Sequence, residues 1–355
     1  MKNLKLFYFF QNKKIALLDI TIFFRQLSAM TTAAIPIIKT FDILEKSQEK
    51  NTLRILIYSI KRELFAGKNL SEALMNHPNF FNSFTCHLIK IGESTGKIDT
   101  ILQSLAQYYE SKLILKKKIH QAIFYPCIIL LAAFLITFAM LFFVIPKFAE
   151  LFQDMPNKLP FITLIIFKIS SFIRDYAGLM LTAFICLLTS FFFIPSQKLW
   201  LFLMPLFTKL PIIQQFLFKV SLTFFARHLS LTFSSGLPIT EALSLTAKAV
   251  GNPYLSDIIY KIRTKIVSGM TLHHAMSMHH ELPPLLIQLA QVGEESGKLE
   301  QMLDKFVYFN ETEIQTIISY LSNLLEPLIM LVLGVLIGGL VIGMYLPIFK
   351  LGNTF

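Results

Sequence analysis

Two short stretches of this chain carry the residue types of a phosphate-binding loop. Residues 92–98 read Gly-Glu-Ser-Thr-Gly-Lys-Ile, and residues 293–299 read Gly-Glu-Glu-Ser-Gly-Lys-Leu. A phosphate-binding loop has the spacing G-x-x-x-x-G-K-[ST] after a strand, because its backbone N–H groups hold phosphate and its hydroxyl holds magnesium. Here the glycines are one residue too close, Ile98 or Leu299 replaces the hydroxyl residue, and an amphipathic segment precedes each stretch. The pattern therefore argues against nucleotide binding and predicts a capped turn between two helices.

Glycine and glutamate recur at both turns, so we interpret them as structural or partner-contacting positions. The glycines are expected to end one helix, and the polar residues between them to cap the next. Two prolines are expected in the first turn of another helix, one in each half of the chain. The predicted turn positions are Pro36, Gly92, Glu93, Gly96, Pro238, Gly293, Glu294 and Gly297.

One acid, Glu326, lies at the mouth of a long apolar run, where an ionised carboxylate is costly unless it is paired or hydrated. A functional role and a packing role are both open for it, since the corresponding residue of the first half is Tyr125. An intramembrane aspartyl protease needs two facing acids within its spans, and no second acid occurs at comparable depth. We therefore predict no catalytic residue and no enzyme activity.

The same apolar run carries four glycines, which form G-x-x-x-G pairs at 334–338 and 339–343. Such faces let two helix backbones approach closely, so they predict helix packing within the chain or between chains. The predicted membrane-packing positions are Glu326, Pro327, Gly334, Gly338, Gly339 and Gly343.

Residues that bind metals are poorly grouped in this sequence. Four histidines fall within residues 273–280, but no acid or cysteine lies at ligand spacing, which favours a solvated loop. Of the three cysteines, Cys127 and Cys186 fall inside apolar runs, and this indicates neither a disulfide framework nor a metal site. No cofactor is predicted.

The composition predicts an all-α membrane protein. Of 355 residues, 54% are hydrophobic and only 15% are charged, which is too apolar for an ordinary soluble protein. Apolar runs at 122–145, 177–194 and 324–346 reach the length of about 20 residues that crosses a bilayer core. A fourth run, 159–176, is interrupted by Lys168 and Arg174, so we interpret it as amphipathic rather than spanning.

The net charge of +11 is concentrated in the N-terminal part, where residues 1–120 carry 18 Lys/Arg and 9 Asp/Glu. Three consecutive lysines, 116–118, come just before the first apolar run, which is typical of the cytoplasmic side. The excess also suits a surface that faces anionic membrane lipid or an acidic partner, and we predict no nucleic-acid partner. The first apolar cluster, residues 4–10, is too short for a secretory signal, so the N-terminus is expected to remain.

Apolar residues at a spacing of three and four predict six helices before the first apolar run. The expected landmarks are Asp19 as the cap of the first helix, Pro36 in the first turn of the second, a third helix from Asn51 to Ala66, Ser71 as the cap of the fourth, a fifth helix over 82–91, and Asp99 at the start of the sixth.

The chain is a tandem repeat. Arg25 pairs with Arg227 at an offset of 202, and the offset has become 201 where Gly92 pairs with Gly293, which predicts a one-residue deletion after residue 275. The pairing continues to the ends of two apolar runs, where Ile-Pro-Lys-Phe at 145–148 matches Leu-Pro-Ile-Phe at 346–349. Each unit therefore comprises six helices and one span.

Homologous domains are expected on the same side of the membrane, so an even number of crossings must separate them. The unpaired second apolar run supplies the return crossing. The predicted segments are a short N-terminal segment (1–18), a first cytoplasmic six-helix bundle (19–120), a transmembrane helix (121–146), a periplasmic loop with an amphipathic segment (147–176), a second transmembrane helix (177–195), a second cytoplasmic six-helix bundle (196–323), a third transmembrane helix (324–347) and a periplasmic tail (348–355).

These features together resemble the type II secretion F protein family and its type IV pilus counterpart, PilC. The resemblance rests on the duplicated six-helix domain, the Ser-Gly-Leu-Pro-Ile turn at 235–239, both Gly-Glu turns, the Glu-Pro pair at 326–327, and the glycine-rich last run. It implies a non-enzymatic, self-associating platform in the bacterial inner membrane. The implied partners are a hexameric secretion or pilus ATPase, pilins or pseudopilins, and other inner-membrane assembly proteins.

The resemblance also implies a calcium site, built in some members from an acid after the Gly-x-Pro turn and the Glu of the Gly-Glu turn. In the first copy the former position is Lys39, which opposes a cation, whereas the second copy has Glu241 and Glu294. Hard cations need several oxygen ligands, so these two acids alone make only a partial site.

The competing interpretation is a small transporter or channel subunit. Secondary transporters are built on many spans around a midplane site. Three apolar runs, with most of the repeat in polar helices, favour the platform interpretation.

Overall fold

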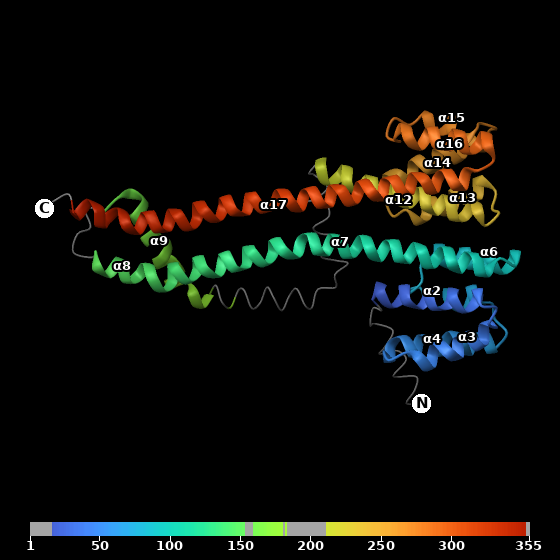
Figure 1. Cartoon of the computed structure of the whole chain (residues 1–355), viewed down its shortest axis with the longest axis horizontal. Helices are drawn as coiled ribbons and strands as arrows, with labels where there is room; N and C mark the ends of the chain where they lie inside the picture. Colours follow the sequence, from blue (N-terminus) through green and yellow to red (C-terminus); the bar gives the residue numbers. More distant parts are fainter. Residues whose placement is uncertain (1–15, 153–158, 180–181, 183–210, 353–355) are drawn as a thin grey trace. The chain divides into compact units, whose positions relative to one another are not determined.

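The computed structural model describes residues 16–152, 159–179, 182 and 211–352, and these residues form helices and connecting turns without a strand (Figure 1). The chain divides into two compact units. One comprises residues 1–117 and 214–315, and the other comprises residues 118–213 and 316–355. The described part is thus all-α, as the composition predicts.

The first unit contains the polar helices of both copies of the repeat. Those of the first copy are α2 (Leu17–Thr32), α3 (Ile37–Ser47), α4 (Asn51–Phe65), α5 (Leu70–Met75), α6 (Ser83–Thr95) and the start of α7 (Ile98–Ala139). Those of the second copy are α12 (Pro211–Ser234), α13 (Ile239–Ala249), α14 (Pro253–Val267), α15 (Leu272–Ser277), α16 (Pro284–Ser296) and the start of α17 (Leu299–Gly352).

The bounds of these helices confirm the tandem repeat. Helices α3, α4 and α5 return as α13, α14 and α15 with both ends shifted by 202 residues, whereas α6 returns as α16 with a shift of 201. The missing residue therefore lies in the connection that follows α15, where the sequence predicts it.

The first copy is held by a hydrophobic cluster with an aromatic centre. Phe24 stacks on Tyr109 with ring centroids 4.9 Å apart, and Phe23 lies edge-on to Phe24 and to Phe41. These rings are almost completely buried. Burial of each such side chain contributes on the order of 2 kcal/mol, so packing of the amphipathic faces rather than helix propensity stabilises these helices.

The second copy has its own cluster, in which Phe225, Leu229 and Phe306 are fully buried. The repeat-equivalent residues of the first copy, Phe23 and Leu27, are buried too. The same apolar spacing therefore builds the same packing twice.

The structure corrects two expected helix caps and one expected helix end. Asp19 does not cap α2, which begins after Ala16; it lies in the first turn and accepts a hydrogen bond from Lys50 Nζ at 2.6 Å. Ser71 does not cap α5, because it is the second residue of that helix. The stretch expected to break the fifth helix at Gly92 instead continues α6 to Thr95.

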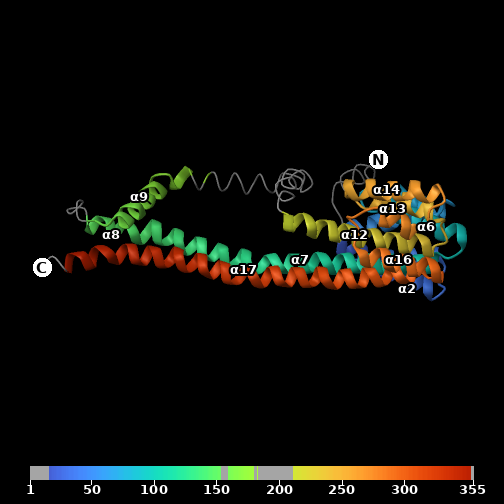
Figure 2. The same ribbon diagram turned by 90° about the horizontal axis from the view of Figure 1, so that it is seen from above.

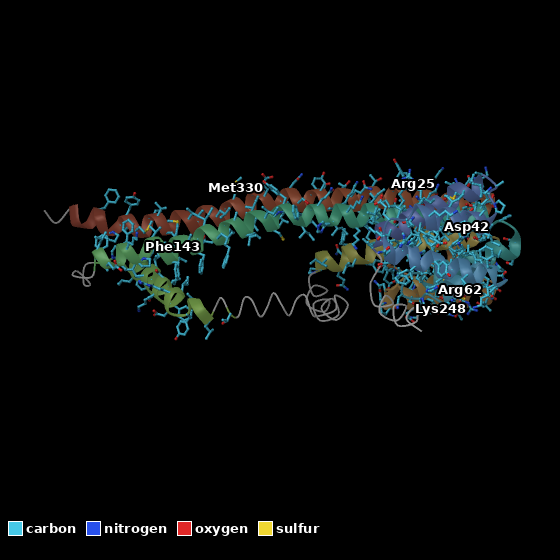
Figure 3. The ribbon with its side chains drawn as sticks, turned by 90° about the horizontal axis from the view of Figure 1, so that it is seen from below. Arg25, Asp42, Arg62, Phe143, Lys248 and Met330 are labelled. Atoms are coloured by element: carbon cyan, nitrogen blue, oxygen red, sulfur yellow. The ribbon has the colours of Figure 1, made fainter. Side chains whose placement is uncertain are left out.

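The second unit contains the apolar segments. Helix α7 passes through a π-helical turn, η1 (Met140–Val144), into α8 (Ile145–Leu151), and α17 continues to its end at Gly352. Two stretches, Ile98–Leu151 and Leu299–Pro347, are long and apolar enough to cross a membrane. Exposed apolar side chains such as Phe143 and Met330 cover them (Figure 3).

The amphipathic segment predicted at 147–176 contains helix α9 (Phe161–Asp175). It packs beside α8 in the views of Figure 1 and Figure 2. The predicted second transmembrane helix, 177–195, lies almost wholly outside the described residues.

Candidate functional site

Glu93 of the first Gly-Glu stretch was expected to act in the turn between α6 and α7. It instead caps the start of α5. Its carboxylate accepts hydrogen bonds from Leu70 N at 2.5 Å, from Ser71 N at 3.3 Å and from the Ser71 hydroxyl at 2.5 Å. The first N–H groups of a helix lack intrahelical partners, and a negative charge is favoured there by the helix dipole. Glu93 therefore ties the end of α6 to the start of α5.

Glu294 makes the equivalent cap in the second copy. It accepts from Leu272 N at 2.6 Å and from His273 N at 2.8 Å, and it lies 2.7 Å from His273 Nδ1. Because a carboxylate only accepts, this last contact requires the proton on Nδ1. An imidazole thus replaces, in the cap of α15, the serine hydroxyl of the first copy.

Each of the two glycines in a Gly-Glu stretch has its own role. Gly96 and Gly297 end α6 and α16 in the left-handed region, with φ of 71° and 69°, which suits a residue without a Cβ. Gly92 and Gly293 lie inside these helices, against the start of the next helix. A Cβ at Gly293 would lie 2.7 Å from Leu299 Cα. These inner glycines therefore permit close packing of consecutive helices.

The two prolines of the sequence prediction lie just before a helix, one position ahead of the first turn in which they were expected. Pro36 precedes α3 and Pro238 precedes α13, and both have φ of −55°. Among the predicted turn positions, the outer glycines and the two prolines thus lie at helix ends, whereas the inner glycines and the glutamates lie within α6 and α16. The glutamates connect α5 to α6 and α15 to α16.

The acids of the calcium hypothesis are placed as follows. Glu294 is engaged by the three protein donors of its cap, and Glu241 lies in the first turn of α13. Across the residues that the structure describes, no group of three or more His, Cys, Asp or Glu side chains is arranged to hold a metal ion. Calcium binding by Glu294 would therefore require its carboxylate to give up the hydrogen bonds that cap α15.

Sequence reasoning missed His228, a residue at the contact between the two copies. Its ring lies 4.0 Å from that of Phe84 and 5.2 Å from that of Tyr108, centroid to centroid, so it bridges the first copy to α12 of the second. Only 2% of the residue is exposed, and neither ring nitrogen has a hydrogen-bond partner. Burial, with the nearby charges of Lys112 and Arg227, lowers the pKa of His228 to about 3. The imidazole is therefore held neutral among aromatic rings.

The predicted membrane-packing residues divide into two groups. Gly343 is buried, and a Cβ there would overlap the Ile166 side chain of α9. The other three glycines of the run, Gly334, Gly338 and Gly339, have open space where a Cβ would be. Glu326 and Pro327 lie exposed on α17. Only the last glycine is therefore used for packing within the described part of the chain.

The described residues define a class of protein: an all-helical chain built from a duplicated unit, each copy of which ends in a helix able to cross a membrane. The family model for protein F of the type II secretion system matches this chain twice, at residues 23–146 and 225–347. The two matches coincide with the two copies of the repeat. The chain belongs to the type II secretion system protein F family.

Relatives that are named for pilus assembly support this assignment. The chain is 38% identical to the type IV pilus assembly protein TapC of Aeromonas hydrophila, over 96% of this chain and 83% of that protein. It is 34% identical to the type IV pilus assembly protein PilC of Pseudomonas aeruginosa, over 96% of this chain and 92% of that protein. It is 24% identical to the type II secretion system protein F of the same organism, over 94% of this chain and 83% of that protein. These relatives and the two apolar helices support an inner-membrane platform protein of such machinery.

Proposed function

We propose that this chain is the inner-membrane platform of a type IV pilus or type II secretion machine, coupling a cytoplasmic hexameric ATPase to the assembly or disassembly of pilins or pseudopilins. The main support for the proposal is that the family model matches the chain twice. In each matched region, polar helices are followed by a helix that is apolar enough to cross a membrane. The relatives named for pilus assembly are more similar to this chain than the relative named for secretion, which favours the pilus.

The coupling is mechanical in this proposal. The last helix of each copy continues into an apolar segment without a connecting loop, over 42 residues in α7 and 54 residues in α17. A continuous helix rises 1.5 Å per residue, so each helix provides a rod of more than about 60 Å. A movement imposed on the polar helices by an ATPase would reach the apolar segments through these two rods.

Crosslinking to a co-expressed ATPase tests the coupling partner. The carboxylates of Glu93 and Glu294 are occupied by their caps, so the crosslinker belongs on exposed side chains such as Arg62 in α4 and Lys248 in α13, labelled in Figure 3. A photo-crosslinker at one or both sites is expected to capture the ATPase. A set of exposed positions on both copies that captures no ATPase would contradict this part of the proposal.

A deletion strain tests the function itself. Loss of pili or of type II secretion, restored by the intact chain, is expected. Normal pili and normal secretion combined with altered solute flux would instead support a transporter or channel subunit.

We further propose three crossings, with the N-terminus and both bundles in the cytoplasm. The lysines at 116–118 support this orientation. Phe65 and Val267 are repeat-equivalent and exposed, and Leu151 is exposed at the end of the first apolar stretch. In intact cells, single cysteines at 65 and 267 are expected to resist a membrane-impermeant maleimide, whereas a cysteine at 151 is labelled. Labelling at only one of the two equivalent positions would contradict the topology.

Self-association is proposed to use the open glycines of α17. A Cβ at Gly334, Gly338 or Gly339 would meet no atom of the described chain within 4 Å, and small residues let a second helix approach. Gly338→Leu is expected to shift the complex to a smaller species on native gels, and an unchanged species would exclude this face.

A further inference from the structure

Helix α9 presents one narrow buried stripe, and two of its three residues are hydroxyls. The stripe consists of Thr163, Ile166 and Ser170, spaced so that they lie on one face of the helix. Thr163 Oγ1 donates to Gly343 O of α17 at 2.7 Å, and Ser170 Oγ donates to Leu141 O of η1 at 2.6 Å. Both hydrogen bonds are buried. Helix α9 is thus bonded to the backbone of two other helices.

These contacts differ from what serine and threonine usually do in a helix. Their hydroxyls commonly donate to a carbonyl three or four residues earlier in the same helix. Ser171, the neighbour of Ser170, does so with Lys168 O at 3.0 Å and is exposed. Thr163 and Ser170 therefore donate across helices because particular carbonyls lie in front of them.

The carbonyl that Thr163 meets has lost its intrahelical donor. In an α-helix the N–H of a residue donates to the carbonyl four residues earlier. The residue four positions after Gly343 is Pro347, which lies inside α17 and has no N–H. Gly343 O is therefore left free by proline, and the Thr163 hydroxyl replaces the missing donor.

The carbonyl that Ser170 meets is free for the same reason. In η1 the hydrogen bonds reach five residues back, as Ile145 N does to Met140 O. The next residue, Pro146, would reach Leu141 O in the same pattern but has no N–H. In a nonpolar surrounding such an orphaned carbonyl is costly, and a neighbouring serine or threonine can satisfy it.

The two prolines occupy the same position of the repeat, since Pro146 and Pro347 are separated by the offset of 201 residues. Helix α9 lies between the copies in sequence and belongs to neither. One unrepeated helix therefore satisfies the same defect in both repeated ones. Between the two hydroxyls, Ile166 packs against Gly343, where the missing Cβ leaves room for it.

We propose that α9 is a clamp that fastens together the ends of the two repeat-related apolar helices, with Thr163 and Ser170 supplying the hydrogen-bond donors that Pro347 and Pro146 lack. The clamp makes the ends of α7–α8 and α17 move as one body. The π-helical turn beside it is the place where α7 can bend, because its hydrogen-bond pattern is already altered. The clamp residues are positioning residues and contact no substrate.

A cysteine pair at 166 and 343 reports on the clamp in the full-length chain in native membranes. The native cysteines are first replaced by alanine, and Ile166→Cys and Gly343→Cys are introduced where the two side chains meet. A rapid disulfide within one chain is expected on mild oxidation, identified by mass spectrometry of the linked peptides. Absence of this disulfide would overturn the contact on which the clamp rests.

The hydroxyls of Thr163 and Ser170 are then removed in the chain that carries the cysteine pair, and the rate of disulfide formation is measured again. Thr163→Val combined with Ser170→Ala is expected to slow the disulfide by at least about tenfold, because two buried carbonyls lose their donors. Ser171→Ala is the matched control and is expected to leave the rate unchanged, as are Thr163→Ser and Ser170→Thr, which keep a hydroxyl. Equal rates in the double variant and the parent would overturn the proposal, as would an equal loss in Ser171→Ala. If the double variant does not accumulate, each single variant is compared with its hydroxyl-keeping partner in the same way.

Discussion

Ala34 and Gly236 occupy the same position in the two copies of the repeat, and both have a left-handed backbone, with φ of 57° and 89°. Each follows the helix that begins its copy, α2 or α12, and precedes the proline that starts the next helix. The left-handed region costs an L-residue with a Cβ about 1 kcal/mol or more, which glycine does not incur. The first copy thus holds a strained residue where the second copy has the unstrained one.

We therefore expect Ala34→Gly to stabilise the chain and Gly236→Ala to destabilise it. The added freedom of glycine in the unfolded chain offsets part of the first gain, so the expected change is up to about +1 kcal/mol for Ala34→Gly and about −1 kcal/mol for Gly236→Ala. Thermal unfolding of the detergent-solubilised chain measures both. Changes of the same sign in the two variants would show that the two turns are not equivalent.

Removal of the glutamate caps is expected to destabilise each copy. Glu93→Ala leaves Leu70 N and both donors of Ser71 without their acceptor, and Glu294→Ala does the same in the second copy. A buried donor without a partner costs about 1–3 kcal/mol, so we expect a loss of about 2 kcal/mol in each variant. Chemical unfolding measures the loss.

The controls for the caps are neighbouring acids. Glu72→Ala lies in α5 itself, and Glu295→Ala directly follows Glu294. Both residues are exposed and are expected to change stability by less than about 1 kcal/mol, the range of a single exposed charge at the start of a helix. If the controls lose as much as the caps, the carboxylate contacts do not explain the effect.

The buried His228 predicts a loss of stability in acid. Its pKa in the folded chain, about 3, lies below the ordinary value of 6.5, so between these values the unfolded chain binds the extra proton. The stability of the neutral form is therefore complete above pH 6.5 and falls as the pH decreases toward 3. Between pH 7 and pH 5 this one group accounts for about 2 kcal/mol.

His228→Leu is expected to remove this part of the acid sensitivity, because leucine fills a similar volume and has no nitrogen to protonate. His87→Leu is the control, since His87 is not among the buried residues and contacts Ser83. Unfolding free energies at pH 5 and pH 7 measure the effect. Some dependence is expected to remain in His228→Leu, because burial also lowers the pKa of His77. The same pH dependence in His228→Leu and in the parent would contradict the assignment.

Two salt bridges at equivalent positions differ in their surroundings. Arg25 and Glu110 of the first copy are 3.7 Å apart with side chains 74% and 47% exposed, whereas Arg227 and Glu311 of the second are 2.7 Å apart and 19% and 33% exposed. Exposed pairs contribute little because water and salt screen them. Double-mutant cycles are expected to give a coupling below about 0.5 kcal/mol for the first pair and about 1–2 kcal/mol for the second. Equal coupling free energies would show that the lower exposure of the second pair does not strengthen it.

Local patterns in the sequence predicted the repeat and most helix positions. Apolar residues such as Phe23 and Leu27 recur at helical spacing, and the motif returns at a constant offset. Gly96 and Pro36 act on the backbone at their own positions, so their roles as helix end and helix start could be predicted without the fold. The double family match supports the same division of the chain.

The contacts that the sequence did not predict join residues far apart in the chain. Glu93 was expected to act in its own turn but bonds to Ser71, 22 residues away, and Ser71 was itself expected to be the cap. Thr163 bonds to Gly343 across 180 residues. A periodic pattern contains no information about which side chain meets a free backbone group, since this depends on how the helices pack. The recurrence of Glu at 93 and 294 was the one available signal, because a cap shared by both copies has to return with the repeat.

The inner glycines of the Gly-Glu stretches provide the sharpest test of helix packing in the polar unit. A Cβ at Gly293 would lie 2.7 Å from the Cα of Leu299, whereas a Cβ at Gly92 would lie 3.1 Å from the Cα of Ile98. Backbone cannot move aside as a side chain does, so Gly293→Ala is expected to cost about 2 kcal/mol despite the better helix propensity of alanine, and Gly92→Ala distinctly less. Gly178→Ala, with open space where its Cβ would lie, is the control and is expected to be neutral or slightly stabilising. Thermal unfolding of the three variants ranks them, and a smaller loss for Gly293→Ala than for Gly92→Ala would show that α17 can shift away from α16 more easily than the packing of Leu299 indicates.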